Sequence, residues 1–180
     1  MYPNAEGVTL LDTCILSYLA RVLDPSYLPA GQPVDDQGIA TLRLHFWGVA
    51  LGVGRVPIRE VGRTPHELDR WGIDRMITNL LDEPELPPAA GPRLKERAHD
   101  LMRVHPHEED CLVVAEAEIL HADCLITFDK KMRKKLNGVA SIAVLSPTEL
   151  WVRLVVPHGT PPKIVPHPTN PLRQQTFWRW

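Results

Sequence analysis

Two aspartates each follow a short apolar segment in this sequence of 180 residues. Asp12 comes directly after residues 7–11, and Asp129 comes two positions after residues 122–127. Short segments of this composition are typical of buried strands. Because the carboxyl ends of parallel strands meet at one edge of a sheet, we expect the two carboxylates to lie close together.

Two further acids stand near predicted helix starts. Asp110 precedes the apolar face of a helix that begins after Pro106, and Glu67 occupies the first turn of a helix opened by residues 64–65. Helix N-termini favour negative charge, so each of these acids taken singly has an ordinary structural explanation. Gathered at one edge of a sheet, however, several carboxylates repel one another unless a hard divalent cation neutralises them. Mg²⁺ or Mn²⁺ takes oxygen ligands, and such a site can activate water and hold a phosphodiester.

The charge balance limits how a nucleic acid could be held. The chain has 20 Lys+Arg and 22 Asp+Glu, whereas a protein that grips a polyanion by bulk electrostatics is usually clearly basic. A polyanion must therefore be held by bound cations or by a local patch. The candidate patch directly follows Asp129 and consists of Lys130, Lys131, Arg133, Lys134 and Lys135. Such a run is most often a solvated helix face, and its position beside Asp129 is what favours a nucleic-acid contact.

The elements that must position these acids alternate between short strands and helices. Strands are predicted at 7–11, 122–127 and 142–145, and helices at 14–20, 36–49, 93–104 and 130–135, with others opening after Thr64, Pro106 and Ser146. Residues 55–61 are predicted as a short edge strand or an extended entry, since Pro57 excludes a central strand. This alternation favours an α/β sandwich with a mostly parallel sheet.

Proline marks a boundary near the end of the chain. Residues 157–180 contain six of the 18 prolines and end in an aromatic cluster at 177–180. We predict a domain over 1–156 and a proline-rich extension over 157–180. The extension drapes over the domain or forms a flexible tail, and its aromatic end argues against pure disorder.

Cysteine usage and hydropathy indicate a cytoplasmic protein. Cys14, Cys111 and Cys124 are odd in number, lack CxxC spacing and lie in apolar segments, which favours buried thiols in a reducing compartment. No apolar run approaches the roughly 20 residues needed to cross a bilayer, so no membrane association is expected. The N-terminus lacks the pattern of a secretory signal.

Four blocks of sequence resemble those of PIN-domain proteins and occur in the same order. They are Leu10–Leu16, Glu109–Ala117, Ala122–Lys130 and Val144–Leu150, so the resemblance covers roughly residues 7–152. That family has a three-layer α/β/α fold, consists of metal-dependent nucleases, mostly ribonucleases, and includes the VapC toxins of bacterial toxin–antitoxin pairs. The resemblance implies a Mg²⁺- or Mn²⁺-dependent endoribonuclease that hydrolyses phosphodiester bonds of single-stranded or structured RNA. It also makes an antitoxin protein and a second copy of the chain candidate partners.

The resemblance also assigns site residues position by position. The family's first, third and fourth acids fall on Asp12, Asp110 and Asp129. Its second acid normally precedes a leucine at a helix start, which fits Glu67 better than Glu60, and the choice between them stays open. The implied metal ligands are therefore Asp12, Glu67, Asp110 and Asp129. Thr127 matches a hydroxyl that the family often places beside the metal, and Thr13 is a weaker candidate for a similar role.

The sequence departs from the family pattern in places. Cys14 stands where asparagine or serine is common, which would alter the polarity beside the metal. Pro65 lies in the region of the second acid, and the proline-rich extension has no counterpart.

Three other interpretations compete with this one. A phosphotransferase with a strand-borne nucleophilic aspartate needs a second aspartate at position 14, which is cysteine. A zinc site is disfavoured because the spacing of the four histidines at 99, 105, 107 and 121 matches no usual cluster, so loop or cap positions are expected for them. The remaining alternative is a PIN-like module that binds RNA or protein without cutting, and metal-dependent cleavage of single-stranded RNA discriminates it from a nuclease.

Overall fold

The computed structural model describes residues 7–24, 26–63 and 67–180, with the side chains of residues 67–71 outside that description. The elements follow in the order β1 (Thr9–Leu11), α1 (Thr13–Val22), α2 (Pro33–Phe46), β2 (Leu51–Gly52), α3 (Arg55–Val61), α4 (Glu67–Leu80), α5 (Ala90–Leu101), α6 (Glu108–Ile119), β3 (Cys124–Ile126), α7 (Lys130–Leu136), β4 (Ala143–Leu145) and α8 (Pro147–Arg153). A short 3-10 turn, η1 (Pro171–Arg173), lies in the C-terminal segment. Within the described part of the chain, no helix is long and apolar enough to cross a membrane.

The four described strands form one parallel sheet in the order β2-β1-β3-β4. Leu11, the last residue of β1, pairs with Ile126, the last residue of β3. The ladder continues one step further, because the Asp12 N–H donates to the Ile126 carbonyl at 3.1 Å. Asp12 and Thr127 therefore leave the sheet side by side, at the carboxyl ends of its two central strands.

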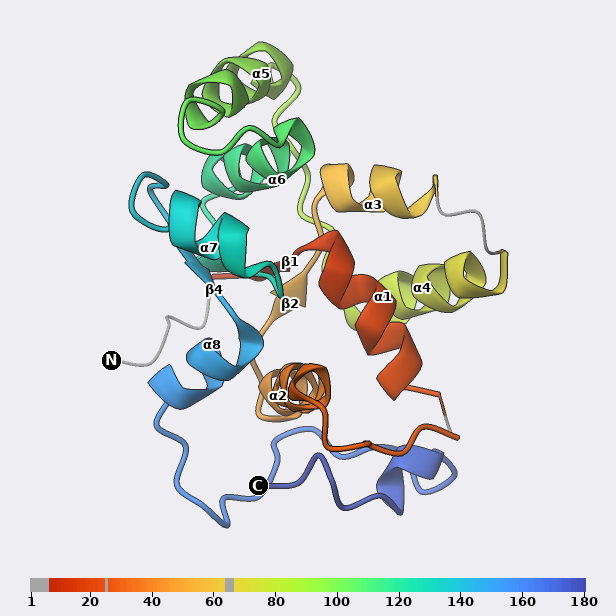
Figure 1. The fold of residues 1–180 in the computed structure, drawn as a ribbon. Coiled ribbons are helices and arrows are strands. Elements are labelled where there is room, and N and C mark those ends of the chain that lie inside the picture. The colour runs from red at the N-terminus through yellow and green to blue at the C-terminus, as the bar shows by residue number, and fades with distance from the viewer. Residues whose placement is uncertain (1–6, 25, 64–66) are drawn as a thin grey trace.

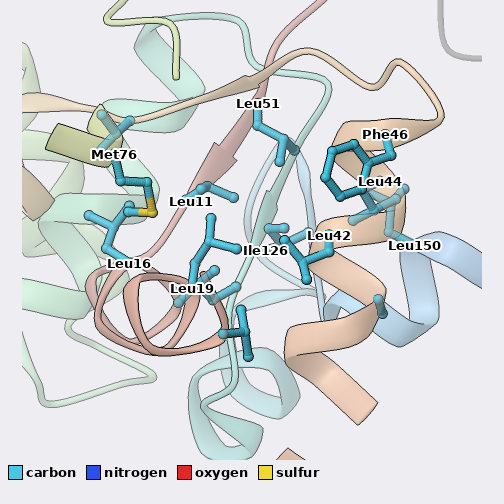
Figure 2. Close-up of a cluster of buried hydrophobic side chains, with 14 of the residues drawn as sticks. Leu11, Leu16, Leu19, Leu42, Leu44, Phe46, Leu51, Met76, Ile126 and Leu150 are labelled. Carbon is cyan, nitrogen blue, oxygen red and sulfur yellow. The ribbon is translucent and has the colours of Figure 1, made fainter. Parts of the chain in front are cut away.

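Helices cover both faces of this sheet, because successive strand residues point to opposite sides. Leu11 and Ile126 pack into a cluster with residues of α1, α2, α4 and α8, and Figure 2 shows part of it. Leu10 and Leu125 pack into a second cluster with α5, α6, α7 and the start of α3. Figure 1 shows the sheet between these two groups of helices. The architecture is the predicted three-layer α/β/α sandwich, with an all-parallel sheet.

The prediction for residues 55–61 was wrong. They form helix α3 instead of an edge strand or an extended entry. Pro57 sits in the first turn of that helix, where a missing N–H breaks no intrahelical bond. The strand at this edge of the sheet is β2, which follows the helix predicted over 36–49; that helix, α2, already ends at Phe46. β2 has only two residues, too few to show a period in the sequence.

The C-terminal segment packs against the outer side of α2. Trp178 is 2% exposed and belongs to the same hydrophobic cluster as Leu11. Its ring packs against that of Phe46 at an interplanar angle of 42°, with centroids 4.4 Å apart, and its indole N–H donates to the Leu172 carbonyl at 2.8 Å. The Ile164 N–H also donates to the Phe46 carbonyl at 2.9 Å. The segment is thus draped over the domain, as Figure 1 shows for the blue end of the chain.

Candidate active site

An open cavity of about 570 Å³ lies at the carboxyl edge of the sheet. The lining residues come from the end of β1, the start of α1, helix α3, the start of α6 and the β3–α7 junction: Asp12, Thr13, Cys14, Ser17, Glu60, Asp110, Phe128 and Asp129. Four of these are acids and none is a lysine or arginine. The cavity thus brings together three acids predicted from the sequence, Asp12, Asp110 and Asp129.

Asp12 is the most enclosed of these acids, at 8% exposure. Its Oδ1 caps α1 by accepting the Thr13 N–H at 2.7 Å. Its Oδ2 accepts the Thr127 hydroxyl at 2.6 Å and the Cys14 thiol at 3.1 Å. Burial raises the pKa of Asp12, with a smaller contribution from the charge of Asp110, while the three hydrogen bonds oppose that shift. The site therefore holds a carboxylate whose negative charge is only partly compensated.

Thr127 connects two of the acids. Its buried hydroxyl donates to Asp12 and accepts the Asp129 N–H at 3.0 Å. Asp129 in turn caps α7, because its Oδ1 accepts the N–H groups of Lys131 at 2.6 Å and Met132 at 3.0 Å. The threonine that the resemblance placed beside the metal therefore lies between the first and fourth acids.

Asp110 is held from the side by a histidine. The His105 ring is 3% exposed, and its Nε2 lies 2.6 Å from Oδ2 of Asp110. His105 sits in the α5–α6 connection, so its loop position agrees with the expectation for the histidines. Its bond to a site carboxylate was missed, because a spacing of five residues across Pro106 follows no helical or strand period.

Glu60 is the fourth acid in the cavity. It lies near the end of α3, and its carboxylate accepts the Thr13 hydroxyl. Burial raises the pKa of Glu60, and the charges of Asp12, Glu109 and Asp110 add to the shift, while the Thr13 bond opposes it. Glu67 is the first residue of α4, but its side chain lies outside the described residues. Of the two candidates for the second acid, Glu60 is thus the one that the described cavity contains.

The chemistry of the donor set fits a hard divalent cation, since the described lining of the cavity contains four carboxylates and no lysine or arginine. Among the described residues, however, no three His, Cys, Asp or Glu side chains are gathered closely enough to hold one ion. Separate partners engage the acids: Asp110 bonds His105, Asp129 caps α7 and Glu60 accepts from Thr13. Mutual repulsion favours such a spread arrangement of like charges.

Helix α7 carries the predicted basic patch beside this cavity. It buries Met132 and Leu136 and leaves its four lysines exposed, at Lys130, Lys131, Lys134 and Lys135. Arg133 differs, because its guanidinium pairs with Glu149 at 2.6 Å. Within the described part of the chain, none of the four lysines forms an ion pair, so their charges face solvent next to Asp129.

Comparison with solved structures identifies the fold. VapBC2 from Rickettsia felis, in a structure described as bound to a DNA fragment from their promoter, matches with a TM-score of 0.53 and 15% identity, covering 76% of this chain and 96% of that one. FitAcB from Neisseria gonorrhoeae matches with a TM-score of 0.47, 15% identity and coverage of 78% and 98%. PAE2754 from Pyrobaculum aerophilum matches with a TM-score of 0.42, 18% identity and coverage of 82% and 97%.

These matches are to PIN-domain, VapC-like structures. The first of them shows that this chain has the PIN-like fold that its sequence blocks resemble. No family model and no curated protein matches the sequence. At these identities the likeness concerns the fold alone.

Proposed function

We propose that this protein is a Mg²⁺- or Mn²⁺-dependent endoribonuclease that hydrolyses phosphodiester bonds of single-stranded or structured RNA. The observation that carries the proposal is the cavity at the carboxyl edge of the sheet, which Asp12, Asp110, Asp129 and Glu60 line and which, among the described residues, no lysine or arginine lines. Ligand and catalytic groups of parallel α/β sheets assemble at this edge. The cavity is open to solvent, and Asp129 in its lining directly precedes the lysines of α7, so a long polyanion can reach it.

The acids Asp12, Asp110 and Asp129 would hold the divalent ion, with Glu60 or Glu67 as the fourth ligand. When bound, the ion would supply Lewis acidity that activates water and offsets the charge of the phosphodiester. Thr127 and Cys14 donate hydrogen bonds to Oδ2 of Asp12, which favour the ionised form of this buried carboxylate. The α7 lysines would attract the RNA backbone by charge.

The experiment is cleavage of a panel of single-stranded and hairpin RNAs by the purified chain with Mn²⁺, Mg²⁺ or EDTA. We expect cleavage with either ion, none with EDTA, and none by Asp129→Asn, which keeps the side-chain volume and the cap on α7. Cleavage that persists in EDTA or in Asp129→Asn would show that other residues do the chemistry.

A second candidate function is a PIN-like module that binds RNA without cutting it. The spread of the acids favours it, since the described residues contain no compact group of three donors. RNA binding that needs the α7 lysines but produces no cleavage with any divalent ion would select this alternative.

We also propose, on the likeness to the Rickettsia VapBC2 structure, that the chain acts as the toxin of a toxin–antitoxin pair. A small protein encoded beside it that co-purifies with the chain and blocks its RNA cleavage would support this role. A neighbouring product that neither binds the chain nor inhibits it would contradict the role.

A second copy of the chain is the other proposed partner. Sedimentation of the purified chain separates a homodimer from a monomer.

A further inference from the structure

A buried glutamate connects the two helices that carry Asp110 and Glu60. Glu116 lies on α6, six positions after Asp110, and is 1% exposed. Its Oε1 accepts the Arg55 N–H at 2.8 Å, and its Oε2 accepts the Val56 N–H at 2.9 Å. These are first-turn N–H groups of α3, which have no partner within their own helix. Glu116 therefore caps α3 from a different helix.

Gly54 makes room for this contact. A Cβ atom at position 54 would lie 2.2 Å from Oε2 of Glu116. The backbone there has φ −79°, which any residue adopts, so the requirement for glycine is one of space. The missing side chain at position 54 thus leaves space for the Glu116 carboxylate directly before α3.

A carboxylate at this place carries an energetic cost. Burial raises the pKa of Glu116, and the two backbone hydrogen bonds, with the charges of Arg59 and Arg55, only oppose the shift. Both oxygens are used as acceptors, whereas an amide offers one acceptor and would turn an NH₂ group toward an N–H. The ionised carboxylate is therefore the form that the contact needs.

The Glu116 contact and Glu60 lie at opposite ends of α3. Glu60 lies five positions after Arg55 in α3, which corresponds to about 7.5 Å along a helix axis. At the other end of the same helix pair, Arg63 pairs with Glu109 at 3.0 Å, in an exposed ion pair. The start of α3 thus meets the later part of α6, and the end of α3 meets the start of α6, beside Asp110. Because exposed ion pairs contribute little, the buried Glu116 contact should hold α3 on α6 more strongly than the Arg63–Glu109 pair does.

We propose that Glu116 is a positioning residue for the site, holding α3 on α6 so that the Glu60 and Asp110 carboxylates keep a fixed relation. The inference rests on the proposed metal-dependent function and on Glu60 as the second acid. Glu116 touches neither the ion nor the RNA in this scheme. It acts through the start of α3, where Gly54 leaves the space that its carboxylate occupies.

The test compares two buried-carboxylate variants of one helix, Glu116→Gln and Glu118→Gln. Glu118 bonds Arg97 at 2.6 Å and the Ser141 N–H at 2.6 Å and has no contact with α3 in the described structure, so it is a matched control. Isothermal titration with Mn²⁺ measures affinity, and circular dichroism confirms folding. We expect Glu116→Gln to lose about 10-fold or more in Mn²⁺ affinity, the size typical of supporting residues around metal ligands. Glu118→Gln should lose stability while keeping the wild-type affinity.

Gly54→Ala provides a second variant, because it displaces the Glu116 carboxylate without removing a charge. It should weaken Mn²⁺ binding in the same way, and it keeps the proposal testable if Glu116→Gln does not fold. Wild-type Mn²⁺ affinity in a folded Glu116→Gln or Gly54→Ala protein would overturn the proposal.

Hydrogen exchange separates this inference from the proposed function. If the wild-type chain binds no Mn²⁺ and cuts no RNA, the proposed function fails, and with it the role of Glu116 at the site. Whether Glu116 stabilises the start of α3 can then still be measured by amide exchange in α3. Faster exchange at residues 56–61 in Glu116→Gln, but not in Glu118→Gln, would show that Glu116 holds α3 on α6. Unchanged exchange in Glu116→Gln would refute that role.

Discussion

The Thr127 hydroxyl donates to Oδ2 of Asp12 at 2.6 Å and joins the ends of the two central strands. The Thr127 hydroxyl oxygen also accepts the Asp129 N–H at 3.0 Å, so one hydroxyl orients both the buried first acid and the turn that carries the fourth. The register that pairs Leu11 with Ile126 produces this arrangement. Thr127 is thus tied to the acids by structure as well as by resemblance.

Replacing Thr127 with valine should reduce RNA cleavage strongly while the protein stays folded. Valine keeps the shape but removes the donor to Asp12 and the acceptor for the Asp129 N–H. We expect a loss of about 10–100-fold in activity, as for other groups that orient metal ligands. Thr127→Ser should retain most of the activity. Equal activity of the valine and serine variants would contradict this role.

Asp12→Asn should stabilise the protein in the absence of divalent ions. Burial raises the pKa of Asp12 in the folded state, so its ionisation opposes folding at neutral pH. We expect a higher melting temperature for Asp12→Asn than for the wild type; in a chain of this size each 1 kcal/mol gained raises it by roughly 2–4 °C. The gain is full above the raised pKa of Asp12 and disappears as the pH falls below the ordinary pKa of an aspartate. Thermal melts in EDTA at several pH values measure it.

In the presence of Mn²⁺, the wild type should become more stable than Asp12→Asn. A ligand that binds only the folded state raises the melting temperature by mass action, and Asp12→Asn lacks one of its ligands. A wild-type melting temperature that does not respond to Mn²⁺ would count against a metal at this cavity.

His105→Phe should weaken Mn²⁺ binding through Asp110. Phenylalanine fills the buried position but cannot bond Oδ2 of Asp110, which then loses the partner that fixes its orientation. We expect a decrease of about 10-fold in affinity. His99→Phe is the control, because His99 is exposed on α5 and forms no hydrogen bond or ion pair with the acids among the described residues. A similar decrease in both variants would show that the effect is not specific to Asp110.

Charge reversal on α7 should weaken RNA binding without affecting the metal. The double variant Lys134→Glu and Lys135→Glu removes two positive charges that would neutralise phosphates. The slope of log affinity against log salt should therefore fall by roughly 0.7 for each phosphate of a single strand that is no longer neutralised. The double variant Arg93→Glu and Lys95→Glu, at two exposed positions of α5, is the control for the same change in net charge. Fluorescence anisotropy with labelled RNA at several salt concentrations gives both slopes, and equal slopes for the α7 and α5 variants would refute the role of α7.

The C-terminal segment should contribute to the stability of the domain. Trp178→Ala removes a fully enclosed ring that packs against Phe46, and substitutions of this kind cost about 3–5 kcal/mol. Val152→Ala, at an exposed position of α8, should change the free energy of unfolding little. Denaturant unfolding measures both. A small effect of Trp178→Ala would mean that the segment folds onto the domain without stabilising it.

The sequence correctly predicted those strands and helices that short runs of neighbouring residues indicate. Short apolar runs that end on Asp12 and Thr127 predicted β1 and β3, and the rule for parallel strands predicted that their acids share one edge. The capping box at Ser146 and Glu149 likewise predicted α8, and both of its hydrogen bonds are formed.

The features that the sequence did not predict depend on tertiary contacts. α3 forms although Pro57 suggested an extended segment: Pro57 stands in its first turn, and Glu116 accepts from its first N–H groups from about 60 residues away. Placing α3 as a strand also removed the helix that brings Glu60 to the cavity, which favoured Glu67 as the second acid. The bond between His105 and Asp110 arises from a loop conformation that no periodic pattern encodes.

The most direct test is single-turnover cleavage of a labelled single-stranded RNA as a function of Mn²⁺ concentration, by the wild type and by Asp110→Asn. Asp110 lines the cavity but caps no helix by a side-chain bond, and asparagine keeps an oxygen that can bond His105, so Asp110→Asn changes the acid cluster with little effect on the fold. We predict that cleavage by the wild type saturates with Mn²⁺ and is abolished by EDTA, and that Asp110→Asn is inactive while its circular dichroism is unchanged. Wild-type protein that leaves the RNA intact at every Mn²⁺ concentration, or Asp110→Asn that cuts as fast as the wild type, would contradict the account.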